Sequence, residues 1–298
     1  MALREEKTQM LFLGTGAAEG FPDPFCGCEA CLAAEKSDDP KLKRRRSALL
    51  LNEETLIDFG PDVMFACAAY GASLRNLRHM FLTHSHEDHF SYWNLAYMGM
   101  SQTWGDRRIA LYMSREARGL IEQFIAWGER CGHPDVENQL RNTEKYYEFV
   151  TVEPFRTYHV DDMNVMAVYG RHDGFAAGEK SLNYYFETPR QGNVFYASDT
   201  GRVYDETYDA LKGKRLDTLI IEGSFGKKPL GPENGHLWQE TLCEALDRLI
   251  AQSTITSATQ IYVTHIAHHG RYTHYDYEAY LQARYGERIH VAYDGLRV

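Results

Sequence analysis

Thr83-His84-Ser85-His86-Glu87-Asp88-His89 is the most informative stretch of this 298-residue chain. It places three imidazoles and a carboxylate within six positions, and such nitrogen and oxygen donors suit Zn²⁺, Mn²⁺ or Fe²⁺. The apolar run Met80-Phe81-Leu82 precedes it, so we expect the donors to begin where a short strand ends. His84 and His86 point the same way along an extended backbone. A turn at Glu87-Asp88 would carry Asp88 and His89 to a second position nearby, so the spacing predicts donors for two metal ions.

Three more candidate donors follow apolar runs in the second half of the chain. His172 follows residues 168–171, Asp199 follows residues 195–198 and His265 follows residues 261–264. Two metal ions about 3.5–4 Å apart need a bridging group and outer ligands, so these positions would complete the set. His159 competes with His172 for the middle position. We favour His172, because a glycine lies two residues away on either side and because it stands closer to Asp199.

A cysteine cluster predicts a separate metal site. Cys26-Gly27-Cys28-Glu29-Ala30-Cys31 holds three of the six cysteines at C-x-C-x-x-C spacing. Three thiolates in six residues suit a structural Zn²⁺, which needs a fourth ligand to complete a tetrahedron. A redox pair or free thiols are the alternatives. His268, three residues after His265, is our candidate for the fourth ligand, and His269 is its rival.

Composition limits the function classes. The chain is 44% hydrophobic and 25% charged, which is typical of a globular protein. No apolar run approaches the roughly 20 residues that span a bilayer, and the first residues lack the apolar core of a secretory signal. We therefore expect a cytoplasmic protein with no membrane partner. The net charge of −10 disfavours nucleic acid as a partner, but it leaves room for a small phosphate ester in a metal-lined pocket.

Short strand-like runs alternate with helical patterns along the chain, which is typical of a layered α/β fold. Residues 20–46 interrupt this alternation as a Cys-rich insertion that ends in a basic run. No linker or repeat divides the sequence, so we expect a single domain over residues 1–298. The expected strands lie near residues 10–13, 47–51, 55–57, 80–82, 109–113, 165–169, 184–187, 194–197, 218–221 and 260–263, and the expected helices near 61–70, 90–100, 114–127, 237–251 and 276–285.

The H-x-H-x-D-H run resembles that of the metallo-β-lactamase superfamily of binuclear hydrolases. The resemblance implies a four-layer αββα sandwich with the metal site at one edge of two sheets. It also implies two divalent ions that share seven ligands: His84, His86 and His172 hold one ion, Asp88, His89 and His265 hold the other, and Asp199 bridges them. Asp58, which ends the run Leu56-Ile57, would support the metal-binding loops, and helix capping is the alternative role for it.

The cysteine cluster narrows the resemblance to a subfamily. Together with the arginines 44–46 and the H-x-x-H of residues 265–268, it makes the chain similar to the phosphonate-pathway phosphodiesterases that open a phosphoribosyl cyclic phosphate. More distant resemblances are to pyrroloquinoline quinone biosynthesis protein B and to a tRNA 3′-processing endonuclease. The implied activity is metal-dependent hydrolysis of a small cyclic or nucleotide-like phosphodiester by a hydroxide between two Zn or Mn ions, or Fe ions. The alternatives are hydrolysis of a thioester, lactone or other acyl substrate, and a non-hydrolytic accessory role in cofactor biosynthesis.

The expected catalytic residues are Asp88, Asp199 and His236. Related phosphodiesterases have a histidine at a helix start, as His236 is here, and it is proposed to contact the phosphate or to protonate the leaving alkoxide. A capping or surface histidine is the alternative. The basic run at residues 41–46 would either steer an anionic substrate or form a solvated loop, which we favour. We assign four aromatic residues to the core rather than to a cleft: Tyr92, Trp93, Trp104 and Trp127. A homodimer is left open.

Overall fold

Two sheets form the centre of the protein. The coordinates, a computed structural model, describe residues 9–298 except 102, 133 and 232. The first sheet has strands in chain order: β1 (Leu11–Gly14), β2 (Ala48–Asn52), β3 (Thr55–Ile57), β4 (His79–Phe81), β5 (Ile109–Met113) and β6 (Tyr147–Thr151). The second runs from β13 (Ile289–Val291) through β12 (Gln260–Thr264), β11 (Thr218–Glu222), β10 (Gly192–Ala197), β9 (Lys180–Thr188) and β8 (Met163–Asp173) to β7 (Thr157–Val160).

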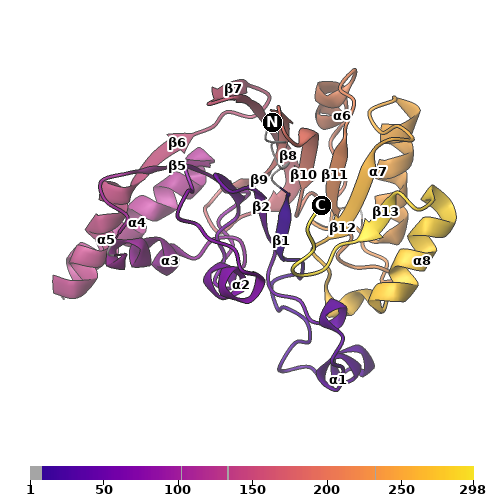
Figure 1. Cartoon of the computed structure of the whole chain (residues 1–298), viewed down its shortest axis with the longest axis horizontal. Helices are drawn as coiled ribbons and strands as arrows, with labels where there is room; N and C mark the ends of the chain where they lie inside the picture. The colour runs from indigo at the N-terminus through magenta and orange to yellow at the C-terminus, as the bar shows by residue number, and fades with distance from the viewer. Residues whose placement is uncertain (1–8, 102, 133, 232) are drawn as a thin grey trace, which may run out of the picture.

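Helices cover the outer face of each sheet (Figure 1). One flank carries α3 (Tyr92–Tyr97), α4 (Arg115–Cys131) and α5 (Pro134–Tyr146), with α2 (Val63–Tyr70) at the lower end of the first sheet. The other flank carries α6 (Asp205–Leu211), α7 (Gln239–Ala251) and α8 (His274–Tyr285). The short helix α1 (Glu29–Glu35) lies in the Cys-rich insertion and projects from the lower edge.

The alternation of side chains along the strands builds the layers. Successive residues of a strand face opposite sides of the sheet. Phe12 and Phe81 therefore pack between the sheets against Tyr196, whereas their neighbours Leu13 and Met80 pack against the helices on the outer face. A third apolar cluster lies between the second sheet and its own helices. The protein is thus a four-layer αββα sandwich, as the family resemblance implies.

The carboxyl ends of the parallel strands meet at one edge. β3 to β6 are parallel, and so are β10 to β13. Just beyond three of these strands, Asp58, Asp199 and His265 take positive φ angles of 64°, 48° and 56°. Non-glycine residues adopt this region at a cost of roughly 1–2 kcal/mol each, and such strain gathers at functional sites. The backbone strain at this edge of the sheets therefore indicates a functional site there.

The three arginines of the basic run pair with other parts of the protein, so neither of our expectations describes them, whereas Lys43 is exposed as a solvated loop predicts. Arg44 is only 6% exposed, and its guanidinium donates to Thr15 Oγ1 at 2.7 Å and to His274 Nδ1 at 3.0 Å. Arg45 and Arg46 pair with Asp294 and Asp62 respectively. Their partners lie far along the chain, so the arginines fasten the insertion to the body of the protein.

Other elements depart from the sequence prediction only locally. The structure adds α1, α5, α6, β6, β7 and β13, which the sequence analysis did not predict, and it extends β8 to Asp173 with an irregular register after Tyr169. Tyr92 and Trp104 are buried in the core, as predicted. Trp93 and Trp127 are exposed and pack against each other, so their assignment to the core was wrong. Within the described part of the chain, no helix combines the length and apolar character needed to span a bilayer.

Candidate metal centre

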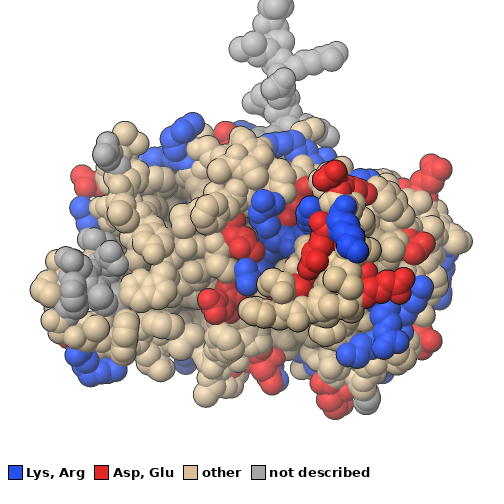
Figure 2. Space-filling view, turned by 90° about the horizontal axis from the view of Figure 1, so that it is seen from below, with Lys and Arg blue, Asp and Glu red and all other residues tan. Residues whose placement is uncertain are grey.

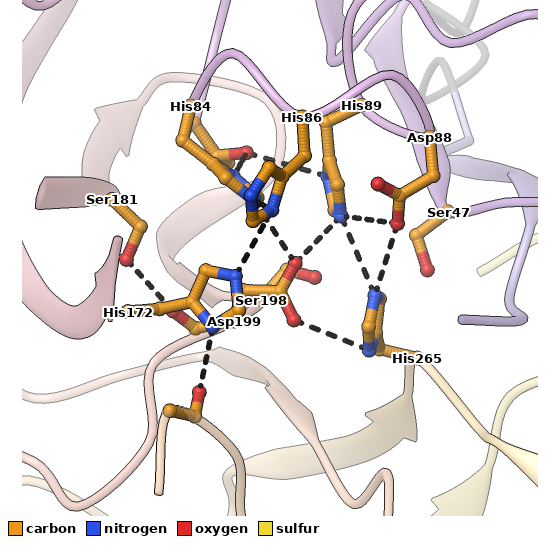
Figure 3. Close-up of polar contacts among 12 residues, drawn as sticks. Ser47, His84, His86, Asp88, His89, His172, Ser181, Ser198, Asp199 and His265 are labelled. Atoms are coloured by element: carbon orange, nitrogen blue, oxygen red, sulfur yellow. Dashed lines mark hydrogen bonds and ion pairs between the residues drawn. The ribbon is translucent and has the colours of Figure 1, made fainter. Parts of the chain in front are cut away.

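Three histidines converge at the strand edge to form a first cluster. His84 and His86 come from the loop after β4, and His172 comes from the irregular end of β8 (Figure 3). His86 Nδ1 lies 3.0 Å from His84 Nε2 and 3.1 Å from His172 Nε2. Nitrogens bound at about 2.0–2.1 Å to one tetrahedral ion would lie close to this spacing. These three atoms could therefore hold a single divalent ion.

In His84 and His172, the hydrogen-bond partner of Nδ1 determines which ring nitrogen carries the proton. His172 Nδ1 lies 3.1 Å from the carbonyl oxygen of Gly235, which can only accept a hydrogen bond. His84 Nδ1 lies 3.0 Å from Thr83 Oγ1, whose own hydroxyl donates to Asp58. Both rings must donate through Nδ1, so both Nε2 atoms carry a lone pair toward the cluster. Burial lowers the pKa of His84 and of His172, which keeps the two rings neutral.

The close approach of Gly235 to His172 requires a glycine. A Cβ at this position would lie 2.5 Å from His172 Nδ1, closer than any ordinary contact. A side chain there would displace the ring or the carbonyl, so Gly235 contributes to the site by having none. This position, together with the carbonyl, carries no signal that the sequence alone would reveal.

The second cluster contains Asp88, His89, Asp199 and His265, all buried and with donor atoms within 4.8 Å of one another. His89 Nδ1 lies 2.7 Å from Asp58 Oδ2, which fixes the proton on Nδ1 and directs Nε2 into the cluster. His265 Nδ1 lies 2.9 Å from Ser224 Oγ, which donates to Glu222. The Nε2 atoms of His89 and His265 then lie 3.4 Å apart inside the cluster.

Asp199 lies between the two clusters. Its Oδ2 is 2.6 Å from His89 Nε2 in the second cluster and 3.6 Å from His84 Nε2 in the first. Its backbone carbonyl accepts from Ser181 Oγ at 2.7 Å, which holds the segment in place (Figure 3). A carboxylate oxygen in this position suits an atom that two neighbouring ions share. This is the place that the resemblance gave to Asp199.

The second cluster gathers buried carboxylates whose negative charge must be balanced by protonated histidines or by a bound cation. Burial opposes a charged His89, yet Asp88, Asp58 and Asp199 raise its pKa well above the usual value. A proton on the face of the ring toward Asp199 would supply the positive charge that a divalent ion would bring. Asp199 Oδ1 is also buried without a well-formed hydrogen bond. The donor set therefore fits divalent ions.

His236 joins the same pocket from the loop before α7. Its Nδ1 lies 3.1 Å from Asp199 Oδ1 and 3.2 Å from Glu222 Oε2. Burial opposes a charged ring, but these carboxylates raise the pKa of His236 to about 11, so the ring is an imidazolium at neutral pH. Trp238 caps the helix that begins at Gln239, so His236 is not its cap, and the His236 side chain is only 22% exposed.

Glu222 is the functional candidate that the sequence reading missed. It is fully buried at the end of β11, and its carboxylate contacts His236 and Ser224. Its position, a polar donor closing the apolar run Ile220-Ile221, has the same layout as the predicted ligands. This layout could have identified Glu222 from the sequence, but the predicted strand ended at residue 221, one residue before it.

The remaining predicted residues either form the cysteine site or lie outside the donor clusters. Cys26, Cys28, Cys31 and His268 bring four donor atoms within 4.8 Å of one another, with Cys28 Sγ 3.6 Å from His268 Nδ1. That contact lowers the pKa of the Cys28 thiol to about 6. His269, the rival fourth ligand, stands outside this group. His159 lies on β7 against Asn164, away from both clusters.

The chain matches a known protein family and one curated relative. A sequence model of the family described as Anti-Pycsar protein Apyc1 matches residues 45–236, more than half of the chain. A curated relative, the Octanoyltransferase of Porphyromonas gingivalis (strain ATCC BAA-308 / W83), is 24% identical over 290 residues. That match covers 96% of this chain but 50% of the relative, so the chain spans half of that protein's length.

Solved structures share the fold across nearly the whole chain. A diphosphatase of the PhnP family is 20% identical with a TM-score of 0.69, over 98% of this chain and 96% of that one. Zn²⁺-bound PqqB from Methylobacterium extorquens is 18% identical with a TM-score of 0.70, over 97% and 99%. The metallo-β-lactamase fold protein YhfI from Bacillus subtilis is 14% identical with a TM-score of 0.64, over 98% and 99%.

Proposed function

This chain has the metallo-β-lactamase fold and belongs to the Anti-Pycsar protein Apyc1 family, and we propose that it is a dimetal phosphodiesterase. Its similarity to hydrolases supports a metal-dependent hydrolase. The finer proposal is that the substrate is a small cyclic or nucleotide-like phosphodiester. The observation that carries the two-metal assignment is the position of Asp199 Oδ2 between two neighbouring donor clusters, 2.6 Å from His89 and 3.6 Å from His84. The similarity to a diphosphatase of the PhnP family supports a phosphate ester as the substrate.

The residues would divide the work as follows. His84, His86 and His172 would hold one divalent ion, and Asp88, His89 and His265 the other, with Asp199 shared. Such a pair supplies Lewis acidity toward a phosphoryl oxygen and ionises water near neutral pH. Asp58 and Ser224 keep the ligand nitrogens deprotonated on the face that meets the ions.

His236 would act on the phosphate side of the pocket. The imidazolium that Glu222 holds lies beside Asp199 and lines the same pocket, so it can donate a hydrogen bond to a phosphoryl oxygen or a proton to the leaving alkoxide. A general acid works best with a pKa near the working pH. Metal ions bound to Asp199 would neutralise one of the two carboxylates that raise the pKa of His236. The pKa of His236 would then fall toward the working pH.

A small substrate suits the surface better than a polyanion does. Acidic and basic side chains are interspersed on the face that carries α1 (Figure 2), and the net charge of the chain is −10. A nucleic-acid interface would call for a continuous basic stripe. Acyl hydrolysis is the second candidate, because the name of the curated relative describes transfer of an octanoyl group.

A substrate panel tests the proposal. Protein loaded with Zn²⁺ or Mn²⁺ is assayed on bis(p-nitrophenyl) phosphate, a 3′,5′-cyclic nucleotide, an aliphatic lactone and an octanoyl thioester. We expect metal-dependent turnover of the diesters that a chelator abolishes. Turnover of the lactone or thioester without the diesters would favour acyl hydrolysis and reject the phosphodiesterase.

A further inference from the structure

The three histidines of the first donor cluster are not oriented in the same way. The ring nitrogens of His84 and His172 that point away from the cluster have partners, Thr83 Oγ1 and Gly235 O. Among the described residues no hydrogen bond to Nε2 of His86 is found, although a ligating histidine usually has such a partner. The orientation of His86 must therefore come from its backbone and from the groups that pack against its ring.

Phe175 packs against the ring of His86. The two ring centroids lie 4.5 Å apart and the ring planes meet at 71°, which is a favourable edge-to-face contact. The Phe175 side chain is 64% exposed, so little else holds it. It belongs to residues 174–179, the loop between β8 and β9. The position of this loop therefore helps to fix the ring of His86.

Glu179 closes this loop onto itself. Its side chain is 1% exposed, and its Oε2 accepts from the Ala176 N–H at 3.2 Å. The Glu179 N–H donates to Ala176 O at 3.0 Å, and the Gly174 N–H donates to Glu179 O at 3.3 Å. A Cβ on Gly174 would lie 2.0 Å from Glu179 Oε2, so a side chain there would displace the carboxylate. The carboxylate of Glu179 thus fills the inside of the loop.

The carboxylate of Glu179 also holds the metal-binding loop after β4. Its Oε1 accepts from the Ser85 N–H at 2.9 Å, and its Oε2 accepts from the Ser85 hydroxyl. Ser85 Oγ in turn accepts from the Phe175 N–H at 3.0 Å. Ser85 is buried and lies between His84 and His86 in the chain. One carboxylate therefore fastens the loop of two proposed ligands to the loop that supports one of their rings.

The set of donors around Glu179 is concentrated at the first cluster. A buried carboxylate costs free energy unless donors surround it. Four N–H or O–H groups face this one: two from Ser85, one from Ala176 and the hydroxyl of Ser114 at 3.4 Å. Three of the four belong to the two loops beside the first cluster. Their geometry therefore depends on this carboxylate, as the orientation of His89 in the second cluster depends on a carboxylate partner.

We propose that Glu179 is a positioning residue for the first metal ion. It acts through Ser85 and Phe175, which together set the backbone and the ring orientation of His86. This inference rests on the proposed dimetal function, because an ion must bind at the cluster for the geometry of the ligands to matter. It does not depend on the chemical class of the substrate. Loss of the carboxylate should therefore weaken the binding of one ion and not of the other.

Glu179→Gln tests this role, because an amide has one acceptor oxygen instead of two. Its NH₂ group must face the N–H of either Ser85 or Ala176, and each of these needs an acceptor. We expect zinc to bind about tenfold more weakly at the first cluster and with unchanged affinity at the second cluster and the cysteine site. Anomalous peaks from crystals soaked over a range of zinc concentrations give the occupancy of each site. Competition with a chromophoric chelator gives the affinities in solution.

Two further variants separate ligand positioning from a structural effect. Glu187→Gln removes a carboxylate on the same strand, β9, that pairs with Lys214 and with neither loop, so every zinc affinity should stay unchanged. Ser85→Ala removes the hydroxyl between Glu179 and Phe175 and should weaken the first ion only. If Glu179 acts through Ser85, the fold-loss in the double variant should be smaller than the product of the two single losses. Ser85→Ala decides alone if Glu179→Gln does not fold.

The outcomes distinguish this role from the proposed function. Equal weakening of all zinc sites in folded Glu179→Gln, or the same loss in Glu187→Gln, would overturn the positioning role. Selective loss of the first ion, in a protein whose wild type hydrolyses none of the diesters, would reject the phosphodiesterase and keep the role. Hydrolysis of a diester by the wild type, with unchanged zinc affinity in Glu179→Gln and Ser85→Ala, would reject the positioning role alone.

Discussion

Replacing Asp58 by Asn should weaken metal binding at the strand edge without touching a proposed ligand. Asp58 is fully buried and accepts three hydrogen bonds: from the Thr83 N–H at 2.8 Å, from Thr83 Oγ1 at 2.9 Å and from His89 Nδ1 at 2.7 Å. An asparagine has one acceptor oxygen, so its NH₂ group must face a donor. With the oxygen toward Thr83, His89 would have to move its proton to Nε2, the atom that faces Asp199.

The magnitude follows from the loss of that tautomer. Removing the partner that orients a ligating histidine typically costs about 10–100-fold in metal affinity, which is about 1.4–2.7 kcal/mol. The second ion should therefore dissociate at higher concentration, and activity should return with excess metal. Competition with a chromophoric chelator, read together with the metal dependence of turnover, measures both.

Two internal controls make the result interpretable. The Cys26–Cys28–Cys31–His268 site is distant in sequence from Asp58 and should keep its affinity, which shows that the variant is folded. Asp62→Asn removes a nearby carboxylate that pairs with Arg46 and not with a proposed ligand, so metal affinity should not change. Unchanged affinity in Asp58→Asn, or equal loss in Asp62→Asn, would refute the tautomer argument.

Three further predictions follow from the same site and its surroundings. Asp199→Ala should abolish hydrolysis while the cysteine-bound zinc remains, as metal analysis would show; full turnover would reject the bridging role. His236→Ala should slow turnover about 10²–10⁴-fold for esters with alkoxide leaving groups and much less for p-nitrophenyl esters; equal loss in both classes would argue against proton donation. His274 accepts from Arg44, so burial and that cation lower its pKa from 6.5 to about 3. The unfolded chain then binds a proton that the folded chain does not. The free energy of unfolding should therefore fall by about 1.4 kcal/mol per pH unit between pH 6.5 and about pH 3, and His274→Gln should flatten this slope in denaturant titrations of chelator-treated protein. An unchanged slope would show that His274 does not cause this pH dependence of stability.

The sequence predicts local donor geometry well, because spacing within one loop limits where side chains can point. His84 and His86 lie two residues apart and meet in one cluster, and Asp88 and His89 fall in the other. The donors of the second half were predicted from a shared layout, an apolar strand followed by a polar residue. The flanking glycines and the shorter distance in sequence to Asp199 favoured His172 over His159, and the structure brings His172 to the first cluster.

The parts that the sequence could not predict depend on partners far along the chain. Arg44 looks like one of several solvated cations, and its contacts with Thr15, His274 and the carbonyl of Ala292 explain its burial. The tautomer of His172 depends on a backbone carbonyl, which every residue has. Glu222 gains its role from His236, which comes from a different loop. In each case the tertiary fold, and not the local pattern, decides what the residue does.

Anomalous diffraction from zinc-loaded crystals tests the central claim most directly, because it locates each metal without reference to activity. The account predicts two peaks about 3.5–4 Å apart, one among His84, His86 and His172 and one beside His89 and His265, with Asp199 between them. Peaks confined to the cysteine cluster, or a single peak at the strand edge, would contradict the dimetal centre.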